Sequence, residues 1–197
     1  MEKSHKWWVI SACCVFVLGI SSFGYFYSKA QAEKAQAAKV AEPTTEENTE
    51  EEIKAMELIG QQLPEFTVTD SKGQEVSSQE FYDKPMIIVD WASWCAHCQK
   101  HLPVIQKVYE EYGDKINFVM INLTDEADEP QSQAESYIKE QKFTFPYFFD
   151  QSQTAADSLM VEYIPTTYFV DKNHIVKQVS VSELEEKELK ELLDSLL

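Results

Sequence analysis

The sequence contains no arginine, since all seventeen of its basic side chains are lysine. The planar group that proteins prefer for bidentate contacts with phosphate or guanine is therefore missing. The 34 acidic residues give a formal net charge of −17, and no stretch of the chain gathers the lysines into a basic patch. A phosphate backbone would repel such a surface. Nucleic acid is not an expected partner.

Cysteine is also scarce. There are four, and Cys13 and Cys14 lie inside an apolar run, so Cys95 and Cys98 are the only thiols in the rest of the chain. A closed zinc site usually needs two ligand pairs, and no second C-x-x-C exists. A structural disulfide would more often join distant segments, because closing so short a loop removes little entropy from the unfolded chain. Redox chemistry is favoured, and the alternative is a copper or zinc carrier that uses Cys95, Cys98 and His101.

One long apolar run is present. Residues 7–27 contain no charged side chain, and as a helix they would span roughly 31 Å, close to the thickness of a bilayer's hydrocarbon core. A cleaved signal peptide is the alternative, because AQA at residues 30–32 resembles a cleavage site, but such peptides usually have only about 7 to 15 apolar residues. We expect a transmembrane anchor at residues 7–27 after a short flank at residues 1–6. Amphipathic rings that favour the membrane interface stand at its two ends: Trp7, Trp8, Tyr25 and Tyr27.

Residues 28–59 are rich in Ala, Glu and Lys and contain no aromatic side chain. A segment of this composition cannot bury enough apolar area to offset the entropy lost on ordering. It is predicted to be an acidic, solvated linker. The remaining residues, 60–197, are enough for one domain with a sizeable core.

From residue 63 onward, short apolar and β-branched runs alternate with helical patterns. MIIVDW at residues 86–91 is typical of a buried strand, and it leads into a helical stretch that Gly113 ends. Hairpin signals occur at Lys72–Gly73 and at residues 172–174, and Ser182 is expected to cap a C-terminal amphipathic helix. The pattern predicts an α/β fold whose mixed sheet is covered on both faces. Further strands are expected at residues 116–123, 145–150, 166–171 and 175–181, and further helices at 130–142 and 154–163.

The stretch WCAHC at residues 94–98 places Cys95 after a strand and at the start of a helix. Unsatisfied N–H groups and the helix dipole stabilise a thiolate at that position. Cys98 lies one turn later, where its thiol can attack a mixed disulfide formed by Cys95 and release the partner. We therefore predict that Cys95 is the nucleophile and Cys98 the resolving cysteine.

Several stretches together resemble one known family. WASWCAHC matches the W-x-x-W-C-x-x-C pattern of thioredoxins, Pro103 matches the proline in the helix after the second cysteine, and IPTT at residues 164–167 matches the segment that carries the family's cis-proline. LPEFTVTDSKGQEV, INL and FVDKN match as well. Residues 60–197 thus resemble a thioredoxin-fold domain, and in particular the membrane-anchored ResA/TlpA-type thiol-disulfide oxidoreductases.

This resemblance implies a thioredoxin-like three-layer fold, here preceded by one transmembrane helix. It also implies a cis peptide bond before Pro165, with the backbone of Ile164 and the side chain of Trp94 binding an extended substrate. The implied partners are proteins with thiols or disulfides and a membrane redox partner that recycles the dithiol. No cofactor or metal is implied.

The chain departs from the family behind the dithiol. Counted back from Cys95 without gaps, the family's buried acid falls on Val89, and Asp90 comes one residue late, which on a strand turns it to the opposite face unless a bulge intervenes. The glutamate that ResA-type proteins carry three residues after the second cysteine is replaced by His101. His101 and Asp90 are the candidate groups for proton transfer.

The compartment and the direction of electron transfer are the last expectations. An anchor combined with a domain that has no spare thiol suits the oxidising, extracytoplasmic side of a membrane. The resemblance implies reduction of partner disulfides. His97 favours oxidation instead, because a protonated imidazole near Cys95 would stabilise the thiolate and raise the reduction potential of the couple. The sequence leaves the net direction open.

Overall fold

The sheet is built around the strand that precedes the two cysteines. In the computed structural model, which describes residues 53–197, β3 (Met86–Trp91) is buried at every position. It pairs in parallel with β4 (Asn117–Asn122) and antiparallel with β6 (Thr166–Val170). A strand with neighbours on both sides and helices over both faces needs an unbroken apolar run, and MIIVDW comes close to one.

Seven strands form one mixed sheet in the order β2-β1-β5-β4-β3-β6-β7. The two predicted hairpins supply its edges, and Gly73 has the positive φ, 76°, that the first turn requires. The mixed α/β architecture predicted from the sequence is confirmed. The remaining strands are β1 (Thr67–Thr69), β2 (Glu75–Ser77), β5 (Tyr147–Phe149) and β7 (Val176–Ser180).

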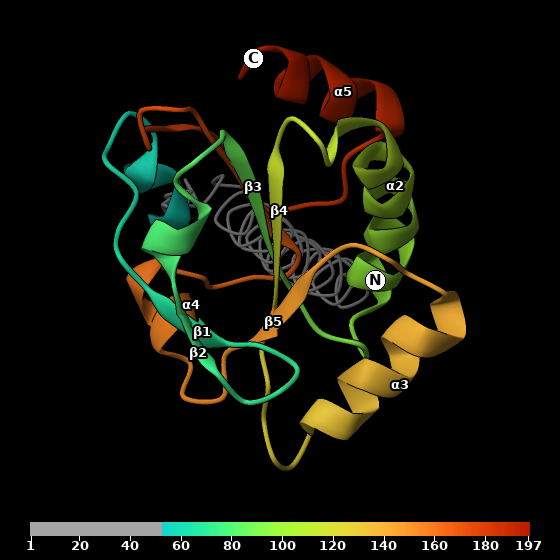
Figure 1. Cartoon of the computed structure of the whole chain (residues 1–197). Helices are drawn as coiled ribbons and strands as arrows, with labels where there is room; N and C mark the ends of the chain where they lie inside the picture. The colour runs from blue at the N-terminus through green and yellow to red at the C-terminus, as the bar shows by residue number, and fades with distance from the viewer. Residues whose placement is uncertain (1–52) are drawn as a thin grey trace, which may run out of the picture. The chain divides into compact units, whose positions relative to one another are not determined.

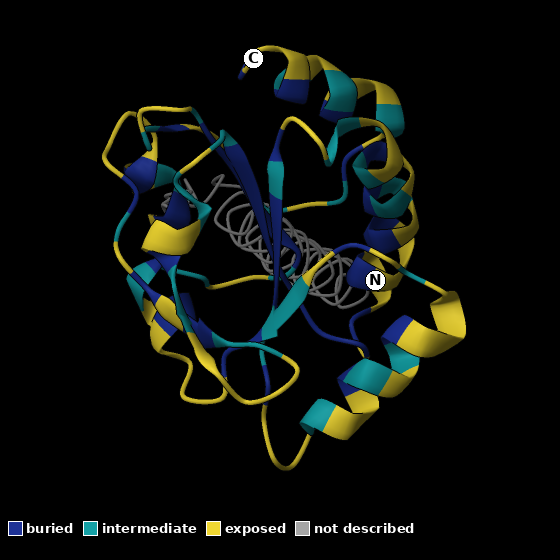
Figure 2. Cartoon of the chain, viewed as in Figure 1, coloured by how far each residue is buried: buried dark blue, intermediate teal, exposed yellow. Residues whose placement is uncertain are grey.

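Helices cover both faces of the sheet, as Figure 1 shows. On one side lie α2 (Ala96–Tyr112), α3 (Gln131–Gln141) and α5 (Glu186–Asp194), and on the other lies α4 (Thr154–Ser158). Alternate residues of β3 point into two separate apolar clusters, and the buried faces of the helices turn toward the sheet (Figure 2). Both cysteines belong to the cluster under α2. Two short 3-10 helices, η1 (Lys54–Leu58) and η2 (Ser78–Phe81), complete the elements.

Three boundaries differ from those predicted. Packing begins before residue 60, because η1 buries Ala55 and Leu58 in the second apolar cluster. Helix α4 ends at Ser158, since Met160 already has a left-handed φ of 57°. Ser182 does not cap the last helix, which begins at Glu186 with Glu185 as its N-cap.

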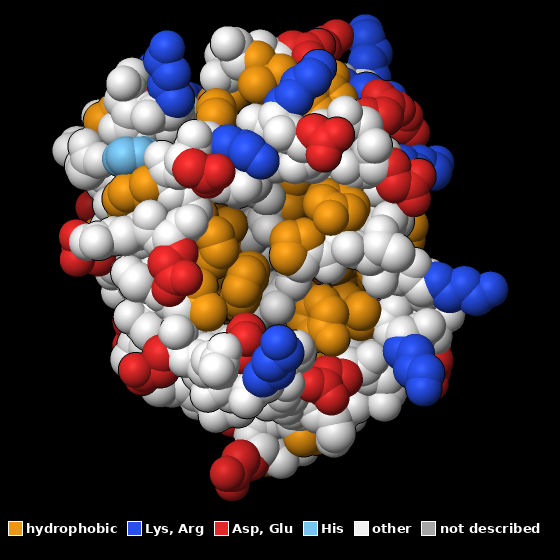
Figure 3. Space-filling model, viewed as in Figure 1, with side chains coloured by type: hydrophobic (Ala, Val, Ile, Leu, Met, Phe, Trp, Pro, Cys, Tyr) orange, Lys and Arg blue, Asp and Glu red, His pale blue; other side chains and the backbone are white. Residues whose placement is uncertain are grey.

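Charged side chains are dispersed on the face seen in Figure 3. Lysines and carboxylates alternate around hydrophobic side chains that reach the surface in separate patches. Among residues 53–197, no helix is long and apolar enough to cross a membrane. The anchor predicted at residues 7–27 lies outside the described residues, as does most of the predicted linker.

Candidate active site

Cys95 is the N-cap residue of α2. Its backbone is extended (φ −73°, ψ 114°), and its Sγ accepts a hydrogen bond of 3.1 Å from the backbone N–H of Cys98. This contact satisfies one of the free N–H groups of the first helical turn and points that N–H at the sulfur. The local geometry therefore suits a nucleophile at Cys95.

Cys98 differs from Cys95 in its surroundings. Its side chain is fully buried, whereas Cys95 retains 6% exposure, and both are free thiols. Burial raises the pKa of Cys98, and the hydrogen bond with Cys95 raises it further. The pair thus consists of a thiol that can reach a partner and a protonated thiol held behind it.

The Ile164–Pro165 peptide bond lies across from Cys95 and is cis, as the resemblance implied. The thiol of Cys95 donates to the carbonyl oxygen of Ile164 at a sulfur–oxygen distance of 3.5 Å. Antiparallel pairing of β6 with β3 fixes this position, because Thr166 is the partner of Asp90 in the register. The sheet itself therefore brings the segment before β6 to the reactive sulfur.

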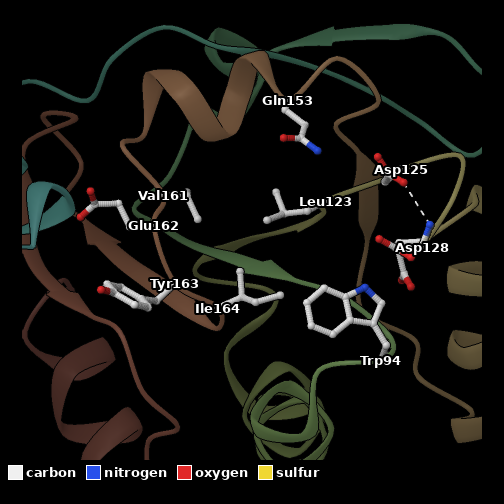
Figure 4. A pocket seen from close by; sticks show the side chains of 10 residues that line it. Trp94, Leu123, Asp125, Asp128, Gln153, Val161, Glu162, Tyr163 and Ile164 are labelled. Atoms are coloured by element: carbon white, nitrogen blue, oxygen red, sulfur yellow. Dashed lines mark hydrogen bonds between the residues drawn. The ribbon is translucent and has the colours of Figure 1, made fainter.

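Trp94 stands at the mouth of a cavity beside this segment. Its indole is 58% exposed, which is high for a large aromatic side chain. Figure 4 shows Leu123, Val161 and Ile164 in the middle of the cavity, with Trp94 next to Ile164. The cavity has a volume of about 320 Å³. Trp94 and Ile164, both predicted to bind substrate, thus line one cavity beside Cys95.

His97 makes its closest polar contact with a carboxylate. Its Nδ1 lies 2.9 Å from Oε2 of Glu183, and its side chain is largely exposed. Lys100 is 3.9 Å from the other oxygen of Glu183. A protonated His97 is therefore partly neutralised by Glu183, so its predicted effect on Cys95 is smaller than that of an unpaired imidazolium.

His101 is buried, although it lies on a helix of which much is exposed. Its Nδ1 accepts the backbone N–H of Leu184 at 3.2 Å, so Nε2 carries the proton and faces Oγ1 of Thr167 at 3.4 Å. Burial lowers the pKa of His101 to about 4. Because its one acceptor nitrogen is already occupied, His101 is poorly placed to take a proton from Cys98.

Asp90 is not brought to the dithiol either. The register of β3 is unbroken through Asp90, so no bulge turns it toward α2, and it faces the second apolar cluster. Both carboxyl oxygens are buried, and neither has a hydrogen-bond partner among residues 53–197. Burial raises the pKa of Asp90 well above its usual value, and the nearby carboxyl of Asp150 adds to the effect. Asp90 is thus a buried acid on the far face of the sheet.

A carboxylate that no sequence motif singles out supports the loop that carries the cysteines. Glu129 is fully buried and accepts hydrogen bonds from the backbone N–H and the Oγ of Ser93, each at 2.7 Å. Asn122 and Gln133 donate to it at 2.8 and 3.0 Å. Gln99 holds the carbonyl of Ser93 at 2.7 Å. In the sequence Glu129 is one of four acids in DEADEP, and no pattern separates it from the others.

The alternative of a metal carrier finds no ligand set in the part of the chain that is described. Within residues 53–197, no three His, Cys, Asp or Glu side chains are grouped so that they could hold an ion. Both ring nitrogens of His101 face other partners, Leu184 and Thr167, and not the sulfurs.

Comparisons with known proteins agree with this geometry. The model of the AhpC/TSA family matches residues 59–179. The thioredoxin-like protein YneN of Bacillus subtilis is 31% identical over 135 residues, which cover 68% of this chain and 78% of that protein. The thiol-disulfide oxidoreductase ResA of Geobacillus kaustophilus is 26% identical over 139 residues, covering 70% and 78%. The crystal structure of StoA from Bacillus subtilis has a TM-score of 0.57 at 25% identity, and the match covers 66% of this chain and 96% of that one.

A thioredoxin-like domain with a C-x-x-C pair at the start of the helix after its central strand defines a thiol-disulfide oxidoreductase, and this chain is one. Within that class the chain belongs to the AhpC/TSA family, whose model matches more than half of its residues. The resemblance to ResA-type proteins found in the sequence is confirmed by the relatives named ResA and YneN.

Proposed function

We propose that the chain is a membrane-tethered, extracytoplasmic protein dithiol-disulfide oxidoreductase in which Cys95 attacks and Cys98 resolves. The observation that carries this proposal is the asymmetry of the pair. Cys95 accepts an N–H bond at the helix start and retains some exposure, whereas Cys98 is buried and its pKa is raised. Only one sulfur is suited to meet a partner as a thiolate.

The exchange proceeds in two displacements. The Cys95 thiolate attacks one sulfur of a partner disulfide, forming a mixed disulfide and releasing the other partner sulfur as a thiolate, which takes up a proton. Cys98 then loses its proton and attacks the sulfur of Cys95. The Cys95–Cys98 disulfide forms and the second partner sulfur leaves, so the partner gains the two electrons that the dithiol loses. The same two displacements in reverse oxidise a partner dithiol, and the net direction stays open. A membrane redox partner returns the chain to its starting state in either case.

The partner protein is held by Ile164, Pro165 and Trp94. The carbonyl oxygen of Ile164 lies 3.5 Å from the reactive sulfur, where an extended segment can pair its own N–H groups with this backbone. Pro165 is buried and fixes the position of the adjoining Ile164. The exposed Trp94 offers apolar contact area to the same partner segment. His97 tunes the potential of the couple, with Glu183 limiting its effect.

Tethering is supported by residues 7–27, which are long and apolar enough to span a bilayer. An extracytoplasmic location is supported by the lack of any thiol outside that run other than Cys95 and Cys98, because a stray thiol would mispair in an oxidising compartment. The chain should fractionate with membranes, and protease added to intact protoplasts should remove the domain. Full protection of the domain would place it in the cytosol and contradict this part of the proposal.

The activity is tested with the full chain and a model protein that contains one accessible disulfide. The reduced chain should reduce that disulfide in a one-to-one reaction, and Cys95→Ser should abolish the reaction. An unchanged rate in Cys95→Ser would contradict the proposed chemistry.

A further inference from the structure

The segment before the cis-proline forms a ridge between two cavities. Tyr163 and Ile164 line both of them. One cavity continues toward His97. Among the described residues that line it, the only carboxylate is Glu183, which already contacts His97 and Lys100. The other lies on the side of Trp94, and we name it the acidic groove. Its apolar floor and its acidic rim are formed by Trp94, Leu123, Val161, Ile164, Asp125 and Asp128.

The acidic groove adjoins the reactive sulfur. Ile164 belongs to its lining, and the carbonyl of the same residue is the one that lies 3.5 Å from Sγ of Cys95. Successive residues of an extended chain are about 3.3 Å apart. When a partner's cysteine is bonded to Cys95, the partner residues about two positions before or after that cysteine therefore lie over the groove. The groove can thus select among partner sequences.

The rim of the groove carries two carboxyl groups and, among the described residues, no cation. Oδ1 of Asp125 accepts the backbone N–H groups of Ala127 and Asp128 at 2.8 and 3.0 Å, and these bonds lower the pKa of Asp125. Within residues 53–197, neither Asp125 nor Asp128 forms an ion pair. No lysine or histidine of the described residues lines the groove. The negative charge of the groove is thus not balanced by any cation among the described residues that line it.

The other two carboxylates of the cavity behave differently. Glu162 forms an ion pair with Lys54 at 2.7 Å. Both carboxyl oxygens of Glu129 accept hydrogen bonds from Ser93, one from its backbone N–H and one from its hydroxyl. Figure 4 shows Asp125 and Asp128 on the side of the cavity nearest Trp94, with Glu162 on the opposite side. The unpaired negative charge therefore lies beside an exposed indole. A cation can interact both with carboxylates and with the face of a tryptophan ring.

We propose that the preferred substrates are proteins that carry lysine or arginine about two residues from the reactive cysteine, with that basic side chain in the acidic groove. This proposal rests on the proposed function, because it concerns the partners of the same dithiol. The long apolar stem of lysine or arginine matches the floor of Leu123 and Val161, and the charged end reaches the rim. An acidic neighbour would be repelled by the same rim.

The test uses three peptides that differ only in charge. Each is a symmetric disulfide dimer with one cysteine per chain, and the residues two before and two after the cysteine are both Lys, both Gln or both Glu. The full chain carries Cys13→Ser and Cys14→Ser, so that only Cys95 and Cys98 react. The rate constant for oxidation of the reduced chain is divided by the rate constant of the same peptide with dithiothreitol, which removes the effect of charge on the peptide's own reactivity.

We expect the normalised rate with the Lys peptide to exceed that with the Gln peptide about fivefold, and the Glu peptide to be slowest. The double variant Asp125→Asn, Asp128→Asn should bring the Lys-to-Gln ratio to within about twofold of unity. The control Glu75→Gln, Glu140→Gln removes the same charge at exposed positions away from the groove and should keep the ratio.

Three results would overturn the proposal: equal normalised rates for the three peptides, a ratio that survives in the Asp125 and Asp128 variant, or an equal loss in the control. The last result would assign the preference to the net charge of the protein. A chain that reacts with none of the peptides, including the neutral one, would instead contradict the proposed function. The two failures are therefore distinguishable.

Discussion

The backbone N–H of Leu184 donates a hydrogen bond to Nδ1 of His101 at 3.2 Å, inside the core between α2 and the segment that precedes α5. This bond fixes the proton of the imidazole on Nε2, toward Thr167. It also explains why the last helix does not start at Ser182, because the N–H of Leu184 is used for a contact with another element. The neutral form of His101 is therefore part of the folded structure.

His101 should make the domain less stable in mild acid. Its pKa is about 4 in the folded chain and about 6.5 in the unfolded chain, so between these values the unfolded chain binds more protons. Its contribution is complete above pH 6.5 and is lost as the pH falls toward 4, by roughly 3 kcal/mol in all. Urea titrations from pH 4 to 7 should show this loss in the wild type and not in His101→Gln. The same pH slope in both proteins would contradict the assignment.

Asp90 should act in the opposite direction. Its pKa is raised in the folded chain, so the folded chain keeps a proton that the unfolded chain releases above about pH 3.8. Stability attributable to Asp90 therefore falls as the pH rises toward the raised pKa. Asp90→Asn has no such proton and should be more stable than the wild type at pH 7 by about 1–3 kcal/mol, with the difference shrinking toward pH 4. A destabilised Asp90→Asn at pH 7 would show that the carboxyl has a partner that compensates for its burial.

The pair of His97 and Glu183 should set part of the redox potential. The reduction potential is expected to lie above that of thioredoxin, about −270 mV, because positive charge near Cys95 stabilises the thiolate and hence the reduced form. Glu183→Gln removes the neutralising charge and should raise the potential, on the order of 10 mV, while His97→Pro should lower it. Equilibration with glutathione measures both, with Glu140→Gln as the control. A wild-type potential at or below that of thioredoxin, unchanged in His97→Pro, would contradict the role of His97.

Glu129 should position the loop that carries Cys95. Glu129→Gln presents a donor where Ser93, Asn122 and Gln133 already donate, so it should lower the free energy of unfolding by about 1–3 kcal/mol. It should also slow the reaction of Cys95 with a peptide disulfide under conditions where the variant is fully folded. Glu126→Gln, an exposed neighbour in the same loop, is the matched control. A variant that is less stable but reacts at the wild-type rate would limit Glu129 to a structural role.

Much of the fold could be predicted from the sequence because its signals are local. The buried run at β3, the two hairpins and the cysteines at the start of α2 each depend on a few neighbouring residues. The C-terminal helix begins later than predicted because a distant imidazole takes a backbone N–H that Ser182 was expected to organise.

The site could be predicted only where its residues carry a motif. Cys95, Cys98 and the Ile164–Pro165 segment were found because their spacing is specific to one family. Glu129 was missed since its importance comes from burial against Ser93, which lies 36 positions earlier in the sequence. His101 and Asp90 were candidates for proton transfer, and that role depends on which way each side chain points. The packing of α2 turns the ring nitrogens of His101 to Leu184 and Thr167, and the unbroken register of β3 keeps Asp90 on the opposite face, as its position one residue late indicates.

The most direct test of the central claim is covalent trapping of partners by variants of the full chain that carry Cys13→Ser and Cys14→Ser, so that Cys98→Ala and Cys95→Ala each retain one thiol. Without the resolving thiol, the mixed disulfide at Cys95 cannot be released, so Cys98→Ala should accumulate partner proteins linked through Cys95. In the same background, Cys95→Ala leaves only Cys98, which is fully buried and whose pKa is raised, and it should trap none. Both variants are expressed in the native membrane, and the adducts are resolved by non-reducing electrophoresis before and after addition of reductant. Adducts with Cys98→Ala alone are the predicted result, and equal trapping by the two variants would contradict the division of roles between Cys95 and Cys98.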